Sequence, residues 1–365
     1  MCRSGSVYTL RIMVLKLSAS GVWMWWASGT VVTVAGLWLW WAAPWADGND
    51  RWKLAARQSS VTYGKVIATG ERDAWAFGWD ILGIAAWLPV ADGPHRPTVF
   101  HWDGDRWTKS DFPVQHGDVG LVAASSPSNL WALAGGSVLR WDGRAWTIVR
   151  EAPDTAWALA VVGDDVWIFG DHKAWYYDGT TWSESRVSFR TLRVGARSAS
   201  DIWALDVDRP FVHHFDGRTW TRLDLSSHLP KSPPPSDDIP PGPLSPRLFA
   251  ITADPSGIWI TGEIGMSSFL LSQTGSGWHR EDTSAKAGRM GRGLPPVHDG
   301  RGGHWFLGST DINGHESALA HRDLFGRWTR VPAGGELTSL SAVPGGPLLA
   351  TGTIGRASGV FRNLP

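Results

Sequence analysis

A short motif recurs along the chain, and its recurrence constrains the fold more than any other feature. An aromatic residue, Asp-Gly and a Trp appear in four close copies, and two looser copies follow. The copies are HWDGDRW (101–107), RWDGRAW (140–146), YYDGTTW (176–182), HFDGRTW (214–220), SQTGSGW (272–278) and RDLFGRW (322–328). Asp-Gly between apolar residues indicates a two-residue type I′ turn, which needs positive φ at both central positions. Each copy therefore predicts a strand, a tight turn and a strand.

Two further apolar runs precede each hairpin. The nearer run begins at a small or acidic residue and contains a Trp. Its copies are DAWAFG (73–78), SNLWALAG (128–135), DDVWIFG (164–170), SDIWALD (200–206), SGIWITG (256–262) and GHWFLG (303–308). Farther upstream lie runs such as GLVAASS (120–126) and TLRVGARS (191–198). Such apolar runs between turns are typical of buried strands, so each unit contains four strands, a to d.

The spacing of the units predicts the architecture. The last Trp of each hairpin recurs after 39, 36, 38, 58 and 50 residues. A repeat of about 40 residues with four strands per unit is typical of a β-propeller blade. Two spacings are longer because of insertions in loops. The apolar residues do not recur with the 3.6-residue period that helical repeats would need.

The end of the chain indicates how the ring closes. A seventh unit starts at LTSLSAV (337–343) and ends at SGVFRN (358–363) without a fourth strand, and DRWKLA (50–55) closely resembles DRWTKS (105–110). We therefore predict an all-β, seven-bladed β-propeller over 50–365, in which the N-terminal strand 51–56 pairs with 358–363 and closes the last blade. The expected blades are 61–110, 119–150, 155–187, 190–224, 246–282, 294–332 and 336–363.

These motifs carry a resemblance. The pattern S-x-x-D-[IV]-W-A-[LV]-G, followed by H-[WF]-D-G-x-x-W, resembles the Trp-rich repeats of secreted or membrane-anchored β-propeller proteins of bacteria, which are distantly similar to kelch propellers. It covers 50–365. The resemblance implies a propeller outside the cytoplasm and implies no activity. Two departures are the adjacent Asp and Gly, which sialidase-like Asp-boxes separate by one residue, and the missing double glycine of kelch repeats.

The first fifty residues have a different composition. Residues 21–46 contain no charged side chain and have Trp clusters at both ends, which predicts a transmembrane signal-anchor helix with aromatic belts. Residues 1–20 would form a short cytoplasmic tail, and the propeller would lie outside the cytoplasm. A cleaved signal peptide, followed by secretion, is the alternative. Translation from Met13 would leave this expectation intact.

Composition excludes several classes of site. The 34 basic and 34 acidic residues balance, which argues against a nucleic-acid-binding surface. The single cysteine, Cys2, excludes disulfides in the propeller and zinc sites with thiolates. His101, His214 and His321 share one position in three units, but separate blades would keep them apart. We therefore expect no metal site and no cofactor, and we expect a monomer.

The insertions indicate a binding face. The long segments 79–98, 224–246, 281–296 and 309–317 follow either the second or the fourth strand of a unit, so all would leave a propeller on the same face. Insertions confined to one face often mark a binding surface, although neutral drift also lengthens loops. The candidate ligand-binding residues in these segments are Trp79, Trp87, Asp80, Asp311, Arg289 and Arg292.

Two classes of function remain. The first is a non-catalytic module, attached to the membrane through 21–46, which binds a protein or a cell-envelope glycan through the insertion-bearing face. The second is a cell-envelope carbohydrate-active enzyme, a glycosidase or a lyase, with its site at the axial mouth. The chain has no Gly-rich phosphate loop, G-x-S-x-G or H-E-x-x-H motif, so the catalytic residues are unknown and the binding module is favoured.

Overall fold

The computed structural model describes most of the 365-residue chain. The described residues are 13–16, 23–27, 30–33, 48–49, 52–56, 61–81, 95–207, 210–231, 245–265, 267–275, 277–290, 294–310, 317–344, 346–355 and 357–363. The chain forms two compact units, Met1–Asp47 and Gly48–Pro365.

The first unit contains a three-stranded antiparallel sheet of β1 (Met13–Lys16), β2 (Trp23–Ala27) and β3 (Thr30–Thr33). The prediction of a helix over 21–46 is therefore wrong at β2 and β3, where aromatic and β-branched residues favour strands. The rest of that segment lies outside the described residues. Among the helices that the structure describes, none is both long enough and apolar enough to cross a bilayer.

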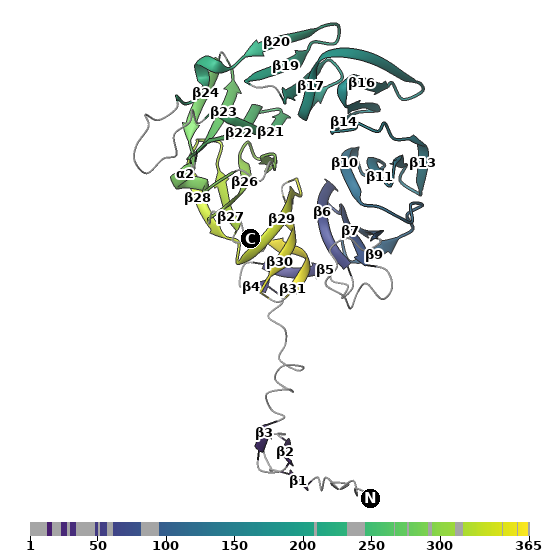
Figure 1. Ribbon diagram of the computed structural model, residues 1–365, viewed down its shortest axis with the longest axis vertical. Coiled ribbons are helices and arrows are strands. Elements are labelled where there is room, and N and C mark those ends of the chain that lie inside the picture. Colours follow the sequence, from purple (N-terminus) through teal and green to yellow (C-terminus); the bar gives the residue numbers. More distant parts are fainter. Residues whose placement is uncertain are drawn as a thin grey trace, which may run out of the picture. The chain divides into compact units, whose positions relative to one another are not determined.

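The second unit is an all-β propeller, in which sheets follow one another around a ring (Figure 1). Five sheets have four or five strands, and one has seven. The first two sheets contain β6 (Val61–Gly70), β7 (Asp73–Ile81), β8 (His95–Trp102) and β9 (Trp107–Ser110), and then β10 (Val119–Ser126), β11 (Asn129–Ala134), β12 (Ser137–Trp141) and β13 (Trp146–Glu151). The seven-stranded sheet contains β14 (Ala158–Val162), β15 (Asp165–Phe169), β16 (Asp171–Tyr177), β17 (Trp182–Ser198), β18 (Asp201–Asp206), β19 (Phe211–Phe215) and β20 (Trp220–Asp224).

Three sheets complete the ring. Two of them contain β21 (Arg247–Asp254), β22 (Gly257–Ile264), β23 (Ser267–Thr274) and β24 (Gly277–Asp282), and then β25 (Val297–His298), β26 (His304–Ser309), β27 (Ser317–Arg322) and β28 (Trp328–Pro332). The closing sheet has the order β29 (Gly335–Ala342), β30 (Leu348–Ile354), β31 (Ala357–Asn363), β5 (Trp52–Ala56) and β4 (Gly48–Asn49).

The seven-stranded sheet differs from the sequence expectation, which gave each repeat a sheet of its own. Strands β14 to β17 form one antiparallel meander and β17 to β20 form another, and β17 belongs to both. No Pro interrupts the 17 residues of β17, and its one Gly, Gly195, comes near the end. Because nothing in this segment forces a turn, the ring has six hydrogen-bonded sheets instead of seven separate ones.

The two ends of the second unit meet in the closing sheet. Strand β5 pairs antiparallel with β31, with Trp52 opposite Asn363, and Trp52 is fully buried. Strand β29 is tied to the first sheet, since the Ser339 hydroxyl accepts a hydrogen bond from the Val66 N–H at 3.2 Å. Closure by the N-terminal strand is therefore confirmed.

The four Asp-Gly hairpins have loops of four residues, which corrects the prediction of a two-residue type I′ turn for them. In the first hairpin, the loop 103–106 separates the paired strands. Asp103 Oδ1 accepts the backbone N–H groups two and three residues later, both at 3.0 Å, and these bonds hold the pKa of its carboxyl below the ordinary value. Positive φ occurs at Gly104 and not at Asp103. The aspartate side chain therefore closes the turn, and the equivalents Asp142, Asp178 and Asp216 do the same.

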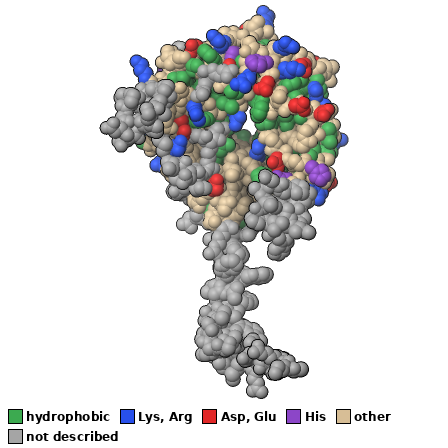
Figure 2. Space-filling model, in the orientation of Figure 1, with side chains coloured by type: hydrophobic (Ala, Val, Ile, Leu, Met, Phe, Trp, Pro, Cys, Tyr) green, Lys and Arg blue, Asp and Glu red, His purple; other side chains and the backbone are tan. Residues whose placement is uncertain are grey.

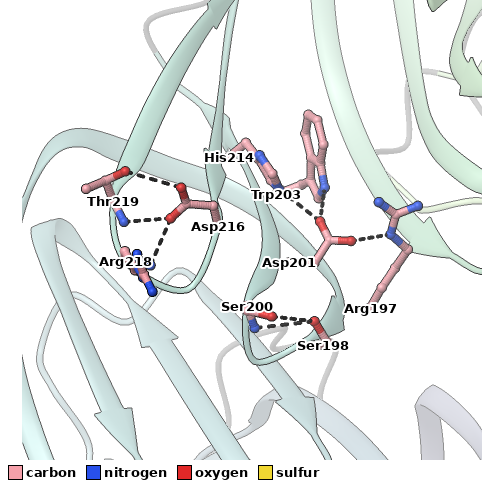
Figure 3. A network of polar contacts seen from close by, with 9 residues as sticks. All are labelled: Arg197, Ser198, Ser200, Asp201, Trp203, His214, Asp216, Arg218 and Thr219. Atoms are coloured by element: carbon pink, nitrogen blue, oxygen red, sulfur yellow. Dashed lines mark hydrogen bonds and ion pairs between the residues drawn. The ribbon is translucent and has the colours of Figure 1, made fainter. Parts of the chain in front are cut away.

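The Trp of the b strand is the centre of a repeated cluster, drawn for one sheet in Figure 3. Asp201 accepts a hydrogen bond from Trp203 Nε1 at 2.7 Å, and it lies 2.9 Å from His214 Nε2. The His214 ring stacks on Trp203, with centroids 4.2 Å apart. In the first sheet, Asp73 bonds to His101 and the His101 ring stacks on Trp75, but the buried Trp75 Nε1 has no hydrogen-bond partner among the described residues. The repeated Trp residues are therefore packing residues, and Trp203 is also held in place by an acid.

We expect the closure to contribute a large share of the stability. Replacing the buried Trp52 with Ala should lower the free energy of unfolding by about 3–5 kcal/mol, measured by urea unfolding. The matched control is Trp107→Ala, at the equivalent but partly exposed position of the first sheet, which should cost less. Equal losses in the two variants would contradict a special role for the closing strand.

Candidate functional site

Four long connections leave the ring on one face, because the antiparallel strand order puts the b–c and d–a connections together. They join β7 to β8, β20 to β21, β24 to β25, and β26 to β27, over residues 82–94, 225–246, 283–296 and 310–316. The first is shorter than the predicted segment 79–98, since β7 and β8 extend into it. Two short helices, η2 (Ser226–His228) and α2 (Ser284–Ala287), lie in these connections. We call this side of the ring the insertion face.

Three of the six candidate ligand-binding residues can be placed. Those outside the described residues are Trp87, Arg292 and Asp311. Trp79 and Asp80 lie in strand β7 and not in a loop, because pairing with β6 and β8 continues to Ile81. Arg289 follows α2. The structure does not bring these three together as one cluster: the first two belong to the first sheet, and Arg289 lies beside β26.

Trp79 covers the insertion-face end of the first sheet. Its ring stacks on His95 of β8, with centroids 5.8 Å apart. It also lies against Gly64 of β6, where a Cβ atom would come within 2.9 Å of the ring. The Trp79 side chain is partly buried, so some of it remains exposed, as expected. Its contribution to binding stays a prediction.

The inner strands of the sheets approach the centre of the ring (Figure 1), and several of them carry charged residues near the insertion face. Beside Trp79, His95 Nδ1 lies 3.0 Å from Asp118 Oδ1. Lys65 and Arg193 lie on the inner strands β6 and β17. Each follows a register shift in its strand, and such bulges redirect side chains. The bulges therefore provide a local reason for cations at these two inner positions.

The electrostatic environment links Lys65, Arg193 and Asp118. Burial lowers the pKa of the Lys65 amino group, the charge of Arg193 lowers it further, and the charge of Asp118 raises it. Burial also lowers the pKa of the Arg193 guanidinium, although Arg193 as a whole is exposed to solvent. Neither cation forms an ion pair with another described residue. Two cations of different sheets thus lie within electrostatic range of each other.

Arg289 stabilises the connection in which it lies. Its Nη2 is 3.4 Å from Oε2 of the buried Glu263, and its backbone forms a bridge with Ser309. Ser268 Oγ donates to Glu263 Oε1 at 3.3 Å and accepts the N–H of Met290 at 2.9 Å. These contacts give Arg289 a structural role, and its contact with a ligand stays a prediction.

A second acid near this face is also held within the protein. Asp206 Oδ2 lies 2.9 Å from His213 Nε2, and both side chains are buried. The His213 ring stacks on Phe189, with centroids 3.9 Å apart. Neither Asp206 nor Glu263 is available as a catalytic acid at the surface, because both are buried and held by neighbouring side chains. Asp118, by contrast, is exposed.

The structure offers no metal site in the residues that it describes, where no group of three His, Cys, Asp or Glu side chains converges. His101, His214 and His321 each bond to an aspartate of their own sheet. Figure 2 shows acidic and basic side chains interspersed over the face that it draws, in agreement with the balanced composition.

Sequence reasoning missed Lys65, His95 and Arg193. A partial signal was available, since Gly64 and Gly120 interrupt inner-strand patterns and an isolated Gly in a strand often marks a bulge. Nothing local indicates that residues of the first sheet and the seven-stranded sheet approach each other, because only closure of the ring brings them together.

The buried His213–Asp206 pair should make stability depend on pH. Burial lowers the pKa of His213 below its ordinary 6.5, and Asp206 only partly offsets this. Below about pH 6.5 the unfolded chain binds the proton more readily than the folded protein, so the free energy of unfolding falls as the pH decreases. His213→Gln should reduce this fall between about pH 7.5 and 5.5, measured by urea unfolding. The exposed His279→Gln is the control; if both variants keep the wild-type pH dependence, His213 is not its source.

Comparisons with known proteins show the fold alone. No protein-family model matches the chain, and no curated protein matches it. Among solved structures, it is similar to a catalytically inactive virginiamycin B lyase from Staphylococcus aureus with quinupristin, with a TM-score of 0.58, 11% identity, and 86% of this chain and 99% of that chain covered.

Two further structures are comparable. YCF48 from Cyanidioschyzon merolae gives a TM-score of 0.55 at 14% identity and covers 86% of this chain and 98% of its own. The propeller domain of the Trilobed protease from Pyrococcus furiosus is described as having an open velcro topology. It gives a TM-score of 0.55 at 8% identity, and the match covers 84% of this chain and 96% of that domain. The strand pairing and these likenesses together show that the second unit of this chain is a β-propeller.

Proposed function

We propose that the protein is a binding module whose insertion face holds an acidic group of a protein or a cell-envelope glycan. The observation that carries this proposal is the placement of Lys65 and Arg193. Burial lowers the pKa of Lys65, the charge of the exposed Arg193 lowers it further, and neither cation has an ion-pair partner among the described residues. Perturbed ionisable groups of this kind concentrate at functional sites. An anionic ligand would compensate for the burial of the Lys65 charge and for the repulsion between Lys65 and Arg193.

The connections of the insertion face would complete the site. Loops positioned by a rigid scaffold often carry recognition, and Trp79 and Trp87 offer large aromatic surfaces at low entropic cost. Trp79, Asp80 and His95 of the first sheet, together with Asp118 just before β10, would then lie beside the two cations. Arg289, Arg292 and Asp311 belong to connections farther around the ring and would contact only a ligand that spans the face.

Catalysis at the same place is the second candidate, in the form of a cell-envelope glycosidase or lyase. The lowered pKa of Lys65 favours it, because a general base works best with a pKa near the operating pH. The similar structures include a lyase and a domain of a protease. Depolymerisation of an envelope polysaccharide by the wild type, but not by Lys65→Met, would support an enzyme over a binding module.

Two finer proposals concern architecture and location. We count seven blades, treating the two meanders that share β17 as separate blades, and we place the protein with the Trp-rich bacterial repeat propellers that its motifs resemble. Location outside the cytoplasm, with attachment through 21–46, also stays a prediction, supported by the uncharged sequence of that stretch. Alkaline extraction of cell membranes, followed by detection of the full-length chain, would test it.

The two inner cations should matter for binding and not for folding. We expect Lys65→Met or Arg193→Gln to weaken capture of partners from cell-envelope fractions about tenfold or more, because a charge-assisted contact is lost. The melting temperature should stay the same or rise, since a desolvated charge is removed. Lys109→Met, on the outer strand β9, is the control. Unchanged capture by both inner variants would refute a role for the two cations.

Trp79 of β7, together with Trp87 in the connection that follows β7, should contribute a hot spot. Replacing Trp79 and Trp87 together with Ala should weaken partner binding by about 2 kcal/mol or more, with little change in the melting temperature. The dissociation constant and thermal unfolding of the double variant would test this. Unchanged binding together with a large loss of stability would identify both as packing residues.

A further inference from the structure

A second site follows from how neighbouring sheets pack. In the first five repeats, the Trp of the b strand is covered by the c–d edge of the next repeat around the ring. Trp75 contacts Trp141, with centroids 4.7 Å apart, and Trp131 contacts Tyr177 at 5.5 Å. The remaining pairs are Trp167 with Phe215 at 5.3 Å, Trp203 with Trp278 at 6.1 Å, and Trp259 with the Arg322 guanidinium at 5.3 Å. These five Trp side chains are all buried.

Trp305 departs from this pattern. Its next sheet is the closing sheet, whose c–d edge consists of the two chain ends in place of a hairpin. There Asn363 pairs with Trp52, at the position where the second sheet pairs Trp141 with Trp146. An Asn thus replaces the covering aromatic residue, and Trp305 is left partly exposed.

A cavity of about 430 Å³ opens at this place. Such a volume lies within the roughly 300–1,000 Å³ of small-molecule sites. The cavity is bordered by Trp305, by the apolar Pro347 and Leu348, and by the polar side chains of His321, Arg362 and Asn363. It lies on the side of the a–b turns, opposite the insertion face. We call it the seam pocket.

The charge of the seam pocket is also unusual. Arg362 occupies the c-strand position that holds His101, His214 or His321 elsewhere. Those histidines lie opposite a Thr and bond to an Asp of the same sheet.

Arg362 instead lies opposite Lys53, and like charges directly opposite each other are destabilising. It forms no ion pair with another described residue. The pocket also contains Arg301 and a single carboxylate, Asp299, which lies 2.8 Å from His321.

We propose that the seam pocket binds a carboxylated sugar, such as a hexuronate residue. The indole of Trp305 offers a flat face for the C–H groups of a pyranose ring. The guanidinium of Arg362 suits a carboxylate, which it can bind through two parallel N–H bonds, while Lys53 adds positive charge beside it. The Asn363 amide lies at the same edge for a ring hydroxyl.

The test is isothermal titration with glucuronate and galacturonate and their short oligomers, with glucose and galactose as neutral controls. We expect the uronates to bind and the neutral sugars to bind at least about tenfold more weakly, because the charge-assisted contact is missing. Arg362→Gln should remove this preference. Arg330→Gln, an exposed arginine of the neighbouring β28, should keep it.

A variant that fills the seam pocket with an aromatic side chain tests the location of the proposed sugar site most directly. Asn363→Trp restores the covering aromatic residue that the other sheets have, so it should abolish uronate binding while the melting temperature stays the same or rises. Binding that survives this variant in the folded protein would place the site elsewhere. Absence of uronate binding to the wild type, or equal binding of neutral sugars, would also overturn the proposal. Since the seam pocket and the insertion face use different residues, either one can fail without the other.

Discussion

Contact between the b-strand Trp of one sheet and the c–d edge of the next is the interaction on which the ring depends. A narrow sheet buries little apolar surface by itself, so each one is stabilised by its neighbours, as in other repeat proteins. Aromatic pairs add about 0.5–1.5 kcal/mol beyond the area that they bury. In one repeat an acid at the a–b turn also orients the indole, since Asp201 accepts a hydrogen bond from Trp203 and lies within hydrogen-bond distance of His214.

Packing between the sheets leaves the inner strands with a different role. Their bulges at Gly64, Gly120 and Leu192 interrupt the pairing with the b strand and redirect side chains toward the centre. A charge placed there gains nothing from the aromatic contacts. Lys65 is partly buried and is repelled by the charge of Arg193, and perturbed ionisable groups of this kind concentrate at functional sites.

The fold could be predicted because most repeats make the same contact, so the same residues recur along most of the chain. Closure was visible for the same reason, since Trp52 repeats the role of Trp107. The conformation of the hairpin loops could not be predicted, because Asp-Gly is compatible both with a type I′ turn and with a loop closed by the Asp side chain. Hydropathy likewise does not separate helix from strand over 21–46, where aromatic and β-branched residues are frequent.

The candidate sites were less predictable, since both depend on which sheets become neighbours. Lys65 and Arg193 are far apart in sequence, and only the closed ring puts them within electrostatic range. The seam pocket arises from the closure itself. A ring that joins its own ends has one edge without a hairpin, and there the chain need not repeat the aromatic pair. Asn363 lies at that edge in place of the covering aromatic residue. Lys53 and Arg362 lie opposite each other at the same edge, and neither forms an ion pair with another described residue.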